Sequence, residues 1–341
     1  MELTKENMEK QTKEEQKNKS TPKLYFAPLE GITGYLYRRI HQELFGGIDQ
    51  YFMPFIMPHT KRNFNSKEQN ELLPEHNKGM IVIPQILTNH AEDFIKMAKE
   101  LWEMGYTQVN LNLGCPSKTV VAKGRGAGFL SYPKELNEFL SKIFEKTSMK
   151  ISIKTRIGKE SPQEWYPLME VYNQYPLEEL IIHPRTQQDY YKNKPNWTIV
   201  QDAVKFSKNP ICYNGDIFTV SDYNRFHHTF PNISSIMLGR GMIANPFLAE
   251  SIAAGENRME KERWQEFHNR LLEVYQETLQ GDTPVLYRMK ELWFYMGASF
   301  TNSEKYSKKI KKCQHLSEYN MVVAALFREE SLNFDFSFSS L

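Results

Sequence analysis

The chain has 341 residues, of which 40% are hydrophobic and 25% are charged, so it can bury a sizeable core and wholesale disorder is excluded. Its 43 Lys and Arg residues nearly cancel its 41 Asp and Glu residues, which leaves a formal net charge of +2. A globally basic nucleic-acid binder is therefore excluded, and any polyanion must be held by a local patch of positive charge.

The first 22 residues are polar, of mixed charge, and carry few large apolar side chains. Such a segment has little to bury against the entropy of ordering, so we expect a disordered tail over 1–22. It lacks the apolar core of a secretory signal, and no stretch of the chain reaches the roughly 20 apolar residues that cross a bilayer. Three widely separated cysteines form no disulfide framework. We therefore expect a cytoplasmic protein in a reducing compartment, without membrane contact.

Eight short apolar, β-prone runs follow, spaced at about 30 residues and separated by helical patterns such as 91–104, 136–144 and 166–175. The runs cover 24–30, 50–55, 81–87, 108–114, 150–157, 179–186, 211–217 and 234–240. This alternation is typical of an α/β fold, the (β/α)8 TIM barrel, which we predict for 23–255. The competing doubly wound sheet carries a Gly-x-Gly-x-x-Gly turn after its first strand, whereas the first run here ends in Ala-Pro-Leu-Glu-Gly.

After Phe247 the pattern becomes purely helical. Apolar stripes at 264–275, 292–296 and 316–326 predict helices, with a break at Gly281-Asp282-Thr283-Pro284. We therefore predict a small C-terminal all-helical domain over 256–332, followed by a loose tail over 333–341.

Residues that could bind a ligand or take part in catalysis stand at the ends of nearly all predicted strands. Barrel enzymes build their active sites at these ends. The residues are Pro28, Leu29, Glu30, Gln85, Asn112, Cys115, Lys154, Arg156, His183, Arg185, Asn214, Gly215, Asp216, Gly239 and Arg240. Polar groups at such positions are costly without partners, so we expect a ligand in the mouth of the barrel. Glycines after the last two strands, together with Arg240, indicate a phosphate site, although each turn alone is also typical of an ordinary tight turn.

Lys154, inside the fifth run, needs an anionic partner. A reduced flavin ring offers one, and an internal ion pair with Glu30 or Asp216 is the alternative. His183 has no second histidine or carboxylate at metal-binding spacing, so we predict no metal site.

Cys115 precedes a proline on the longest connection between runs, which is rich in Gly and Lys, and we expect an enlarged, mobile loop over the mouth. No base lies beside it in the sequence. An unperturbed thiol stays mostly protonated at pH 7, so Cys115 suits a proton donor better than a nucleophile. Cys212 and Cys313 are expected to be structural.

Five lysines fall within eight positions of a predicted helix near the C-terminus. They are Lys305, Lys308, Lys309, Lys311 and Lys312. With Arg288 and Lys290 they predict a phosphate-binding patch, and a solvated helix face is the competing interpretation.

Taken together, these motifs resemble the bacterial tRNA-dihydrouridine synthase family. The resemblance covers about 24–330, and its motifs are APLEG at 27–31, NLNLGCPSKTV at 110–120, GAG at 126–128, KTRIG at 154–158, IHPRT at 182–186, YNGDI at 213–217 and MLGRGMIANPFL at 237–248. The stretch RMKELWFYMG at 288–297 is most similar to the branch that modifies position 16.

The resemblance implies an FMN-binding barrel followed by a helical RNA-binding domain. Such an enzyme reduces the C5–C6 double bond of uridines in the D-loop region of tRNA: NADPH reduces the flavin, hydride passes from flavin N5 to uracil C6, and Cys115 protonates C5. By motif position, the flavin would be held by Pro28, Leu29, Glu30, Gln85, Lys154, His183, Asn214, Gly215, Asp216, Gly239 and Arg240. Asn112 and Arg185 would contact the uracil, and Arg288, Lys290, Lys308 and Lys312 the rest of the RNA. We expect a monomer.

Alternative functions remain open. One is an FMN-dependent reductase of a small pyrimidine or enone, similar to dihydroorotate dehydrogenase. Another is a dihydrouridine synthase that acts on ribosomal RNA, and a third is a non-catalytic RNA chaperone that kept the barrel. The uridine that is reduced, and the choice between NADPH and NADH, also stay open at this point.

Overall fold

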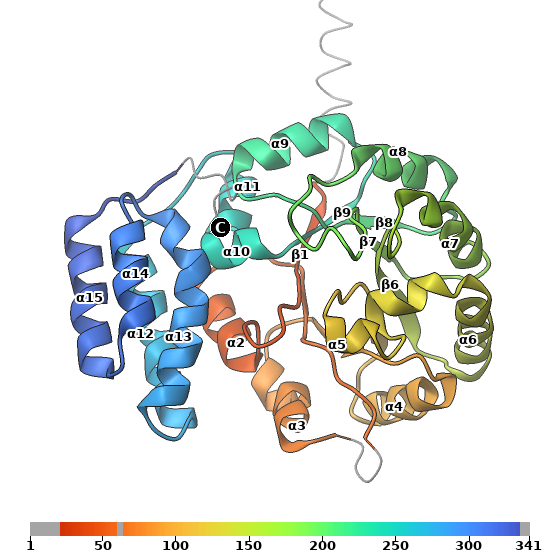
Figure 1. Ribbon diagram of the computed structural model, residues 1–341, viewed down its shortest axis with the longest axis horizontal. Helices are drawn as coiled ribbons and strands as arrows, with labels where there is room; N and C mark the ends of the chain where they lie inside the picture. Colours follow the sequence, from red (N-terminus) through yellow and green to blue (C-terminus); the bar gives the residue numbers. More distant parts are fainter. Residues whose placement is uncertain (1–20, 60–63, 335–341) are drawn as a thin grey trace, which may run out of the picture.

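The computed structural model describes residues 21–59 and 64–334. The tails predicted over 1–22 and 333–341 therefore lie outside the described residues, apart from two positions at each inner end. The described part of the chain is an α/β barrel flanked on one side by a group of helices (Figure 1).

Nine short parallel strands form the barrel in the described residues, in the order β3-β2-β1-β9-β8-β7-β6-β5-β4. They are β1 (Lys23–Phe26), β2 (Gln50–Phe52), β3 (Val82–Ile83), β4 (Gln85–Ile86), β5 (Gln108–Leu113), β6 (Lys150–Arg156), β7 (Leu180–His183), β8 (Ile211–Tyr213) and β9 (Ser235–Leu238). The strands β3 and β4 are two halves of one run, split at Pro84, which has no N–H to donate to the ladder. Because these halves form the two ends of the sheet, the sheet is nearly closed, and the prediction of a TIM-like barrel from eight runs is confirmed at this level.

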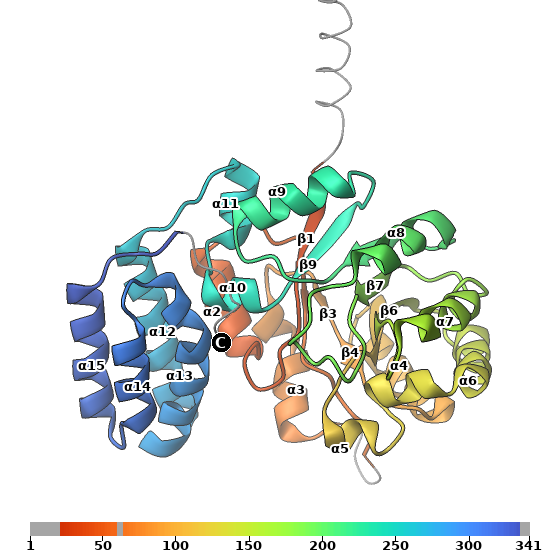
Figure 2. The ribbon, with the colours of Figure 1, turned by 45° about the horizontal axis from the view of Figure 1, so that its top comes forward.

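Helices cover the outside of the barrel (Figures 1 and 2). They are α2 (Tyr35–Leu44), α3 (Ser66–Leu72), α4 (Ala91–Glu103), α6 (Pro133–Lys146), α7 (Trp165–Tyr172), α8 (Trp197–Phe206), α9 (Val220–Thr229) and α11 (Leu248–Ala254). The short helices α5 (Lys118–Val121) and α10 (Arg240–Ala244) lie at the carboxyl ends of the strands instead. The predicted pattern at 91–104 corresponds to α4, which buries Phe94, Met97, Ala98 and Leu101 along one face. No helix in the described ranges is both long enough and apolar enough to cross a membrane.

The barrel interior is packed rather than open. Alternate residues of the strands point inward and form a cluster made of Tyr25, Ala27, Phe52, Ile83, Ile181, Cys212 and Met237, with Leu29 against it. Cys212 is fully buried there, as expected of a packing residue. A ligand of the barrel is therefore confined to its mouth.

The C-terminal part is helical, and each predicted apolar stripe lies on a helix. The helices are α12 (Lys261–Thr278), α13 (Asp282–Met296), α14 (Glu304–Lys312) and α15 (Leu316–Glu329). Tyr37 of α2 and Phe45, directly after α2, meet Phe267 of α12 edge to face, with ring centroids 5.5 and 5.1 Å apart. The C-terminal helices thus share a continuous apolar core with the barrel helices.

Candidate active site

The carboxyl ends of the strands gather at one end of the barrel because all strands are parallel. At this end α5 follows β5 and α10 follows β9, inside the circle of outer barrel helices in Figure 1. The predicted runs were longer than the strands, since their last residues leave the sheet and form the loops of this mouth. All the residues expected at strand ends therefore lie at the mouth.

A chain of hydrogen-bonded amides crosses β4, β5 and β6. The Asn112 side chain donates to Gln85 Oε1 at 2.7 Å, and Gln85 donates to Asn110 Oδ1 at 2.8 Å. Asn110 in turn donates to Ser152 Oγ at 2.8 Å. These buried groups satisfy one another, so each amide is held in one orientation.

The loop that carries Cys115 is fixed at its stem. Asn112 Oδ1 accepts the backbone N–H groups of Gly114 and Cys115 at 3.0 and 2.9 Å, and Arg156 Nε donates to the Gly114 carbonyl at 3.0 Å. At Gly126, where φ is +54°, a Cβ atom would lie 2.9 Å from the Cys115 carbonyl oxygen. Glycine therefore allows the 126–128 segment to pack against Cys115. The expected enlarged loop is present, and it contains α5.

The Cys115 thiol is half-buried at the mouth. Burial raises its pKa above the ordinary value, and a Ser117 backbone hydrogen bond and the positive charges of Arg156 and Lys154 oppose this. The thiol is therefore protonated at neutral pH and available as an acid.

Lys154 lies on β6 in register with Asn112 of β5, so it shares the mouth with the Cys115 loop. Within residues 21–59 and 64–334 it forms no ion pair: Glu30 pairs with Lys67 at 2.9 Å, and Asp216 pairs with two arginines. The internal ion pair considered from the sequence is thus ruled out. Burial, aided by the charge of Arg156, lowers the pKa of Lys154 to about 8.

One carboxylate joins two arginines that follow different strands, Arg185 after β7 and Arg240 after β9. Asp216 Oδ1 accepts from Arg185 at 2.9 Å and from Arg240 at 2.7 Å, while Oδ2 accepts a second N–H of Arg185. Arg185, expected to contact the uracil, is buried and already holds this bidentate pair. Asn214 is also used internally, since it donates to the Met237 carbonyl at 2.8 Å.

Tyr191, which the sequence did not single out, lies over the same loops. The Arg240 guanidinium is 4.5 Å from its ring centroid and that of Arg156 is 5.4 Å away, and His183 meets it edge to face at 5.9 Å. Burial, followed by the charges of four nearby cations, lowers the pKa of His183 well below its ordinary value, so the ring is neutral. Arg156 was expected at a strand end but was given no role in the site, and Tyr191 was missed. The available signal was a Tyr-Tyr pair in a long polar loop after the sixth run.

The remaining predicted residues of the mouth shape its backbone. Pro28, Leu29 and Glu30 follow β1, and the Leu29 N–H donates to Thr33 Oγ1 at 2.8 Å. A Cβ atom at Gly215 would lie 1.9 Å from the Tyr213 hydroxyl oxygen, so a side chain is excluded there. Gly239 directly precedes α10.

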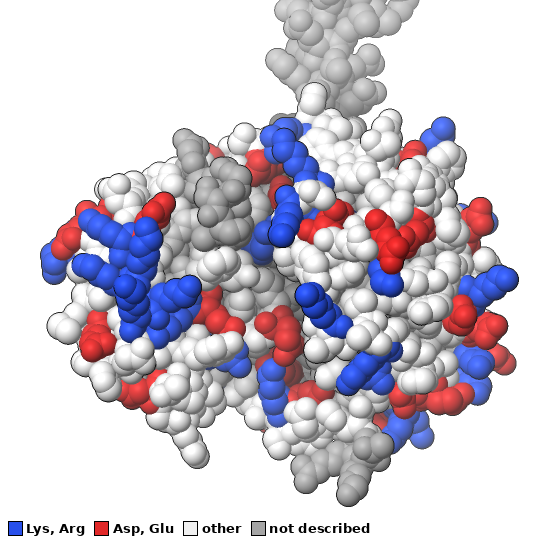
Figure 3. All heavy atoms as spheres, in the orientation of Figure 1, with Lys and Arg blue, Asp and Glu red and all other residues white. Residues whose placement is uncertain are grey.

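The predicted RNA contacts on the C-terminal helices fall into two groups. Arg288 donates to the Gly31 carbonyl in the loop after β1, and Lys290 donates to the Cys313 carbonyl at 2.5 Å. These two residues are held by backbone carbonyl groups, whereas Lys308 and Lys312 are exposed on α14, and Lys308 pairs there with Glu304 at 3.3 Å. Lysine and arginine side chains gather where Figure 1 places α13 and α14, as Figure 3 shows.

Comparisons with known proteins agree with this architecture. The model of the family described as Dihydrouridine synthase (Dus) matches residues 25–331. The tRNA-dihydrouridine(16) synthase of Pseudomonas putida is 30% identical over 242 residues, 68% of this chain and 73% of that protein. Its counterpart from Yersinia pestis is 25% identical over 319 residues, 90% of this chain and 100% of that protein.

A solved structure of 2-naphthoyl-CoA reductase shares the fold, with a TM-score of 0.53 at 11% identity. The match covers 69% of this chain and 50% of that one, so the chain matches about half the length of that structure. At this identity the likeness shows the fold alone. Because the family model spans nearly all of the described residues, the chain belongs to the dihydrouridine synthase family.

Proposed function

We propose that this protein reduces the C5–C6 double bond of uridine in tRNA to dihydrouridine, with FMN in the mouth of the barrel and NADPH as the source of electrons. Family membership supports the reaction class. The observation that carries the proposal is a thiol held protonated on a fixed loop, beside a half-buried lysine that has no carboxylate partner in the described residues. A pyrimidine reductase needs such an acid, and an electron-rich ring would supply the partner.

The residues at the mouth fit a bound flavin. Lys154 leaves a positive charge unbalanced next to a set of oriented amides and a neutral His183, which suits a polar ring that becomes anionic on reduction. FMN, when bound, would supply the hydride that adds to C6 of the uracil. The residues proposed to hold it are Pro28, Leu29, Glu30, Gln85, Lys154, His183, Asn214, Gly215, Asp216, Gly239 and Arg240.

Cys115 completes the reduction on the substrate side. Its Sγ–H donates a proton to C5 as C6 gains hydride, so the uracil gains two hydrogen atoms and the thiolate recovers its proton from solvent. Asn112 holds the loop that presents the thiol, through two backbone N–H groups. Arg185, fixed by Asp216, would contact the uracil. Asn112 would contact it with the second N–H of its side-chain amide, since the first is donated to Gln85.

We further propose that 256–332 act as a helical RNA-binding domain on a cytoplasmic monomer. The positive patch of α13 and α14 supports this, because phosphate contacts supply most of the affinity for RNA in such interfaces. Lys308 and Lys312 would contact phosphates directly. Arg288 would act by holding α13 to the loop after β1.

The test is reduction of uridine in tRNA from a strain that lacks its own dihydrouridine synthases, with FMN and NADPH, followed by mass spectrometry of the nucleosides. Cys115→Ala should lose about 10²-fold or more of uridine reduction while NADPH still reduces the flavin. Cys313→Ala, in the C-terminal helices, is the matched control. Equal reduction of tRNA by Cys115→Ala would refute the acid assignment. Equally efficient reduction of free uridine would favour a small-molecule reductase instead.

A further inference from the structure

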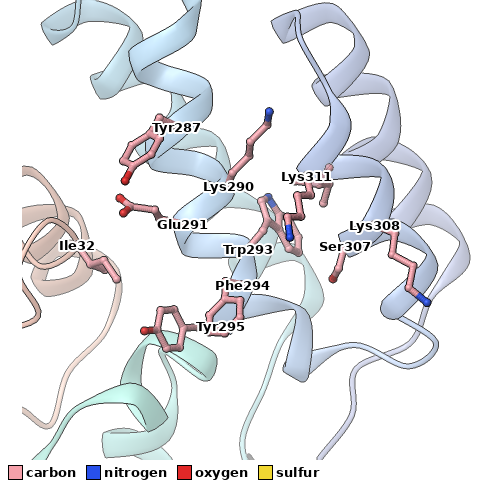
Figure 4. A pocket seen from close by; sticks show the side chains of 11 residues that line it. Ile32, Tyr287, Lys290, Glu291, Trp293, Phe294, Tyr295, Ser307, Lys308 and Lys311 are labelled. Carbon is pink, nitrogen blue, oxygen red and sulfur yellow. The ribbon is translucent and has the colours of Figure 1, made fainter. Parts of the chain in front are cut away.

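A pocket of about 580 Å³ lies beside the barrel mouth, outside the site described above. Its walls come from α13, α14 and the loop after β1 that carries Ile32 (Figure 4). A volume of this size is ordinary for a site that takes a ligand of a few fused or linked rings.

Flat aromatic faces dominate the pocket. Phe294 is 51% exposed and Tyr287 is 60% exposed, which is unusual for such large apolar groups within one pocket. Trp293 is fixed in the wall by donating its indole N–H to the Tyr319 hydroxyl at 2.6 Å. Figure 4 shows Tyr287 and Glu291 directed toward the loop of Ile32. The pocket therefore offers stacking surfaces to a planar ligand.

The edge of the pocket is positive. Lys290 and Lys311 line it from two helices, and Lys308 joins them. The acidic residue in the lining, Glu291, is 3.2 Å from Arg288 Nη1 and is thereby balanced. An anion next to an aromatic group would be complementary to this arrangement.

The wall of the pocket adjoins the barrel mouth. Tyr295 in its wall packs against Phe218, whose ring lies 5.5 Å from the Arg240 guanidinium of the mouth. An RNA strand that enters the mouth would thus pass the pocket.

We propose that this pocket binds a second nucleotide of the substrate RNA, different from the uridine that is reduced, with its base stacked on Phe294 and its phosphate on Lys311. A nucleotide combines the planar ring and the anion that the lining calls for, and base stacking on aromatic side chains tolerates any base. This inference rests on the proposed function, because it assigns a further subsite to the same substrate.

The test uses the full-length protein with FMN and measures tRNA affinity at fixed salt, together with the rate at which NADPH reduces the flavin. Phe294→Ala should weaken tRNA binding about 10-fold, since a stacked base is lost, while flavin reduction is unchanged. Phe294→Trp should restore affinity. Met321→Ala removes an even more exposed apolar side chain from α15, outside the pocket, and should bind like the native protein. Ultraviolet cross-linking should attach the RNA to the peptide that contains Phe294.

Native affinity in Phe294→Ala, with cross-links elsewhere, would overturn the inference even if uridine is reduced normally. Native affinity in Phe294→Leu would also overturn it, because an apolar group without a π face would then suffice. Should the native protein reduce no uridine, the proposed function fails separately. The affinities of the variants for tRNA would still test the pocket, since RNA binding can be measured without uridine reduction.

Discussion

Asn112 Oδ1 accepts the backbone N–H of Cys115 at 2.9 Å, and the same oxygen accepts the N–H of Gly114. The other end of the Asn112 amide is held by Gln85. The strand β5 therefore sets the position of the thiol through a side chain rather than through the loop itself. Asn112 acts on Cys115 as a positioning residue, in addition to the uracil contact proposed for it.

Replacing Asn112 with alanine should release the Cys115 loop. We expect uridine reduction to fall about 10²-fold, because a misplacement of about 1 Å has that effect on a reacting group. Alkylation of Cys115, followed by mass spectrometry, should become faster, which loss of a uracil contact alone would not cause. Asn209→Ala is the control, since it removes a buried amide that bonds Leu177 and Tyr172 and contacts neither Gln85 nor the Cys115 loop. An unchanged alkylation rate in Asn112→Ala would contradict the positioning role.

The raised pKa of Cys115 predicts slow alkylation. The thiolate is the reactive form, so at pH 7 iodoacetamide should modify Cys115 more slowly than it modifies free glutathione in the same buffer. The rate should still be rising at pH 9, where glutathione is levelling off. If Cys115 reacted faster than glutathione at pH 7, its side chain would be a thiolate at that pH. A thiolate cannot donate a proton, so this result would contradict the role of Cys115 as the acid.

Lys154 should make flavin binding depend on pH. Its pKa in the free protein is about 8, so the ammonium is present below that pH and is lost as the pH rises through it. A flavin that favours the charged form raises this pKa on binding. FMN affinity of the apoprotein should therefore be constant below pH 7 and weaken by up to about 10-fold per pH unit above 8. Fluorescence titration measures it, and Lys154→Met should bind more weakly with no such dependence. A native profile as flat as that of Lys154→Met would contradict this.

Glu179 at the base of the barrel should make stability fall with pH. Its carboxyl group accepts hydrogen bonds from Tyr25 and Ser235, but burial dominates and raises its pKa from 4.5 to about 7. The unfolded chain releases this proton first, so stability is highest below pH 4.5 and decreases until pH 7. Glu179→Gln should remove this loss, which amounts to about 3 kcal/mol at about 1.4 kcal/mol per pKa unit.

Thermal melting of the native protein and Glu179→Gln at pH 5 and pH 8 measures the difference. The stability gained by the variant should be larger at pH 8. The neighbouring Glu178→Gln, which removes only an exposed ion pair with Lys150, should show little change at either pH. An equal gain in stability at both pH values for Glu179→Gln would mean that folding does not raise the pKa of this carboxyl group.

The repeated runs predicted the barrel because parallel strands buried on both faces need continuous apolar segments, and these recur in the sequence whatever lies between them. The same logic placed Lys154 and Asn112 at the mouth, since parallel strands end on one side. The run 81–87 was predicted as one strand although it contains Pro84, whose missing N–H splits it into two.

The sequence by itself determined which residues stand at the ends of the strands, and its motifs pointed to the family of the chain. Only the tertiary structure decided how those residues are used: Asp216 shared by Arg185 and Arg240, Tyr191 beneath a guanidinium, and an aromatic pocket where α13 and α14 meet the loop of Ile32. The reason is physical. Periodicity and turn chemistry act over neighbouring residues, whereas a contact between side chains dozens of positions apart depends on how whole elements pack against one another.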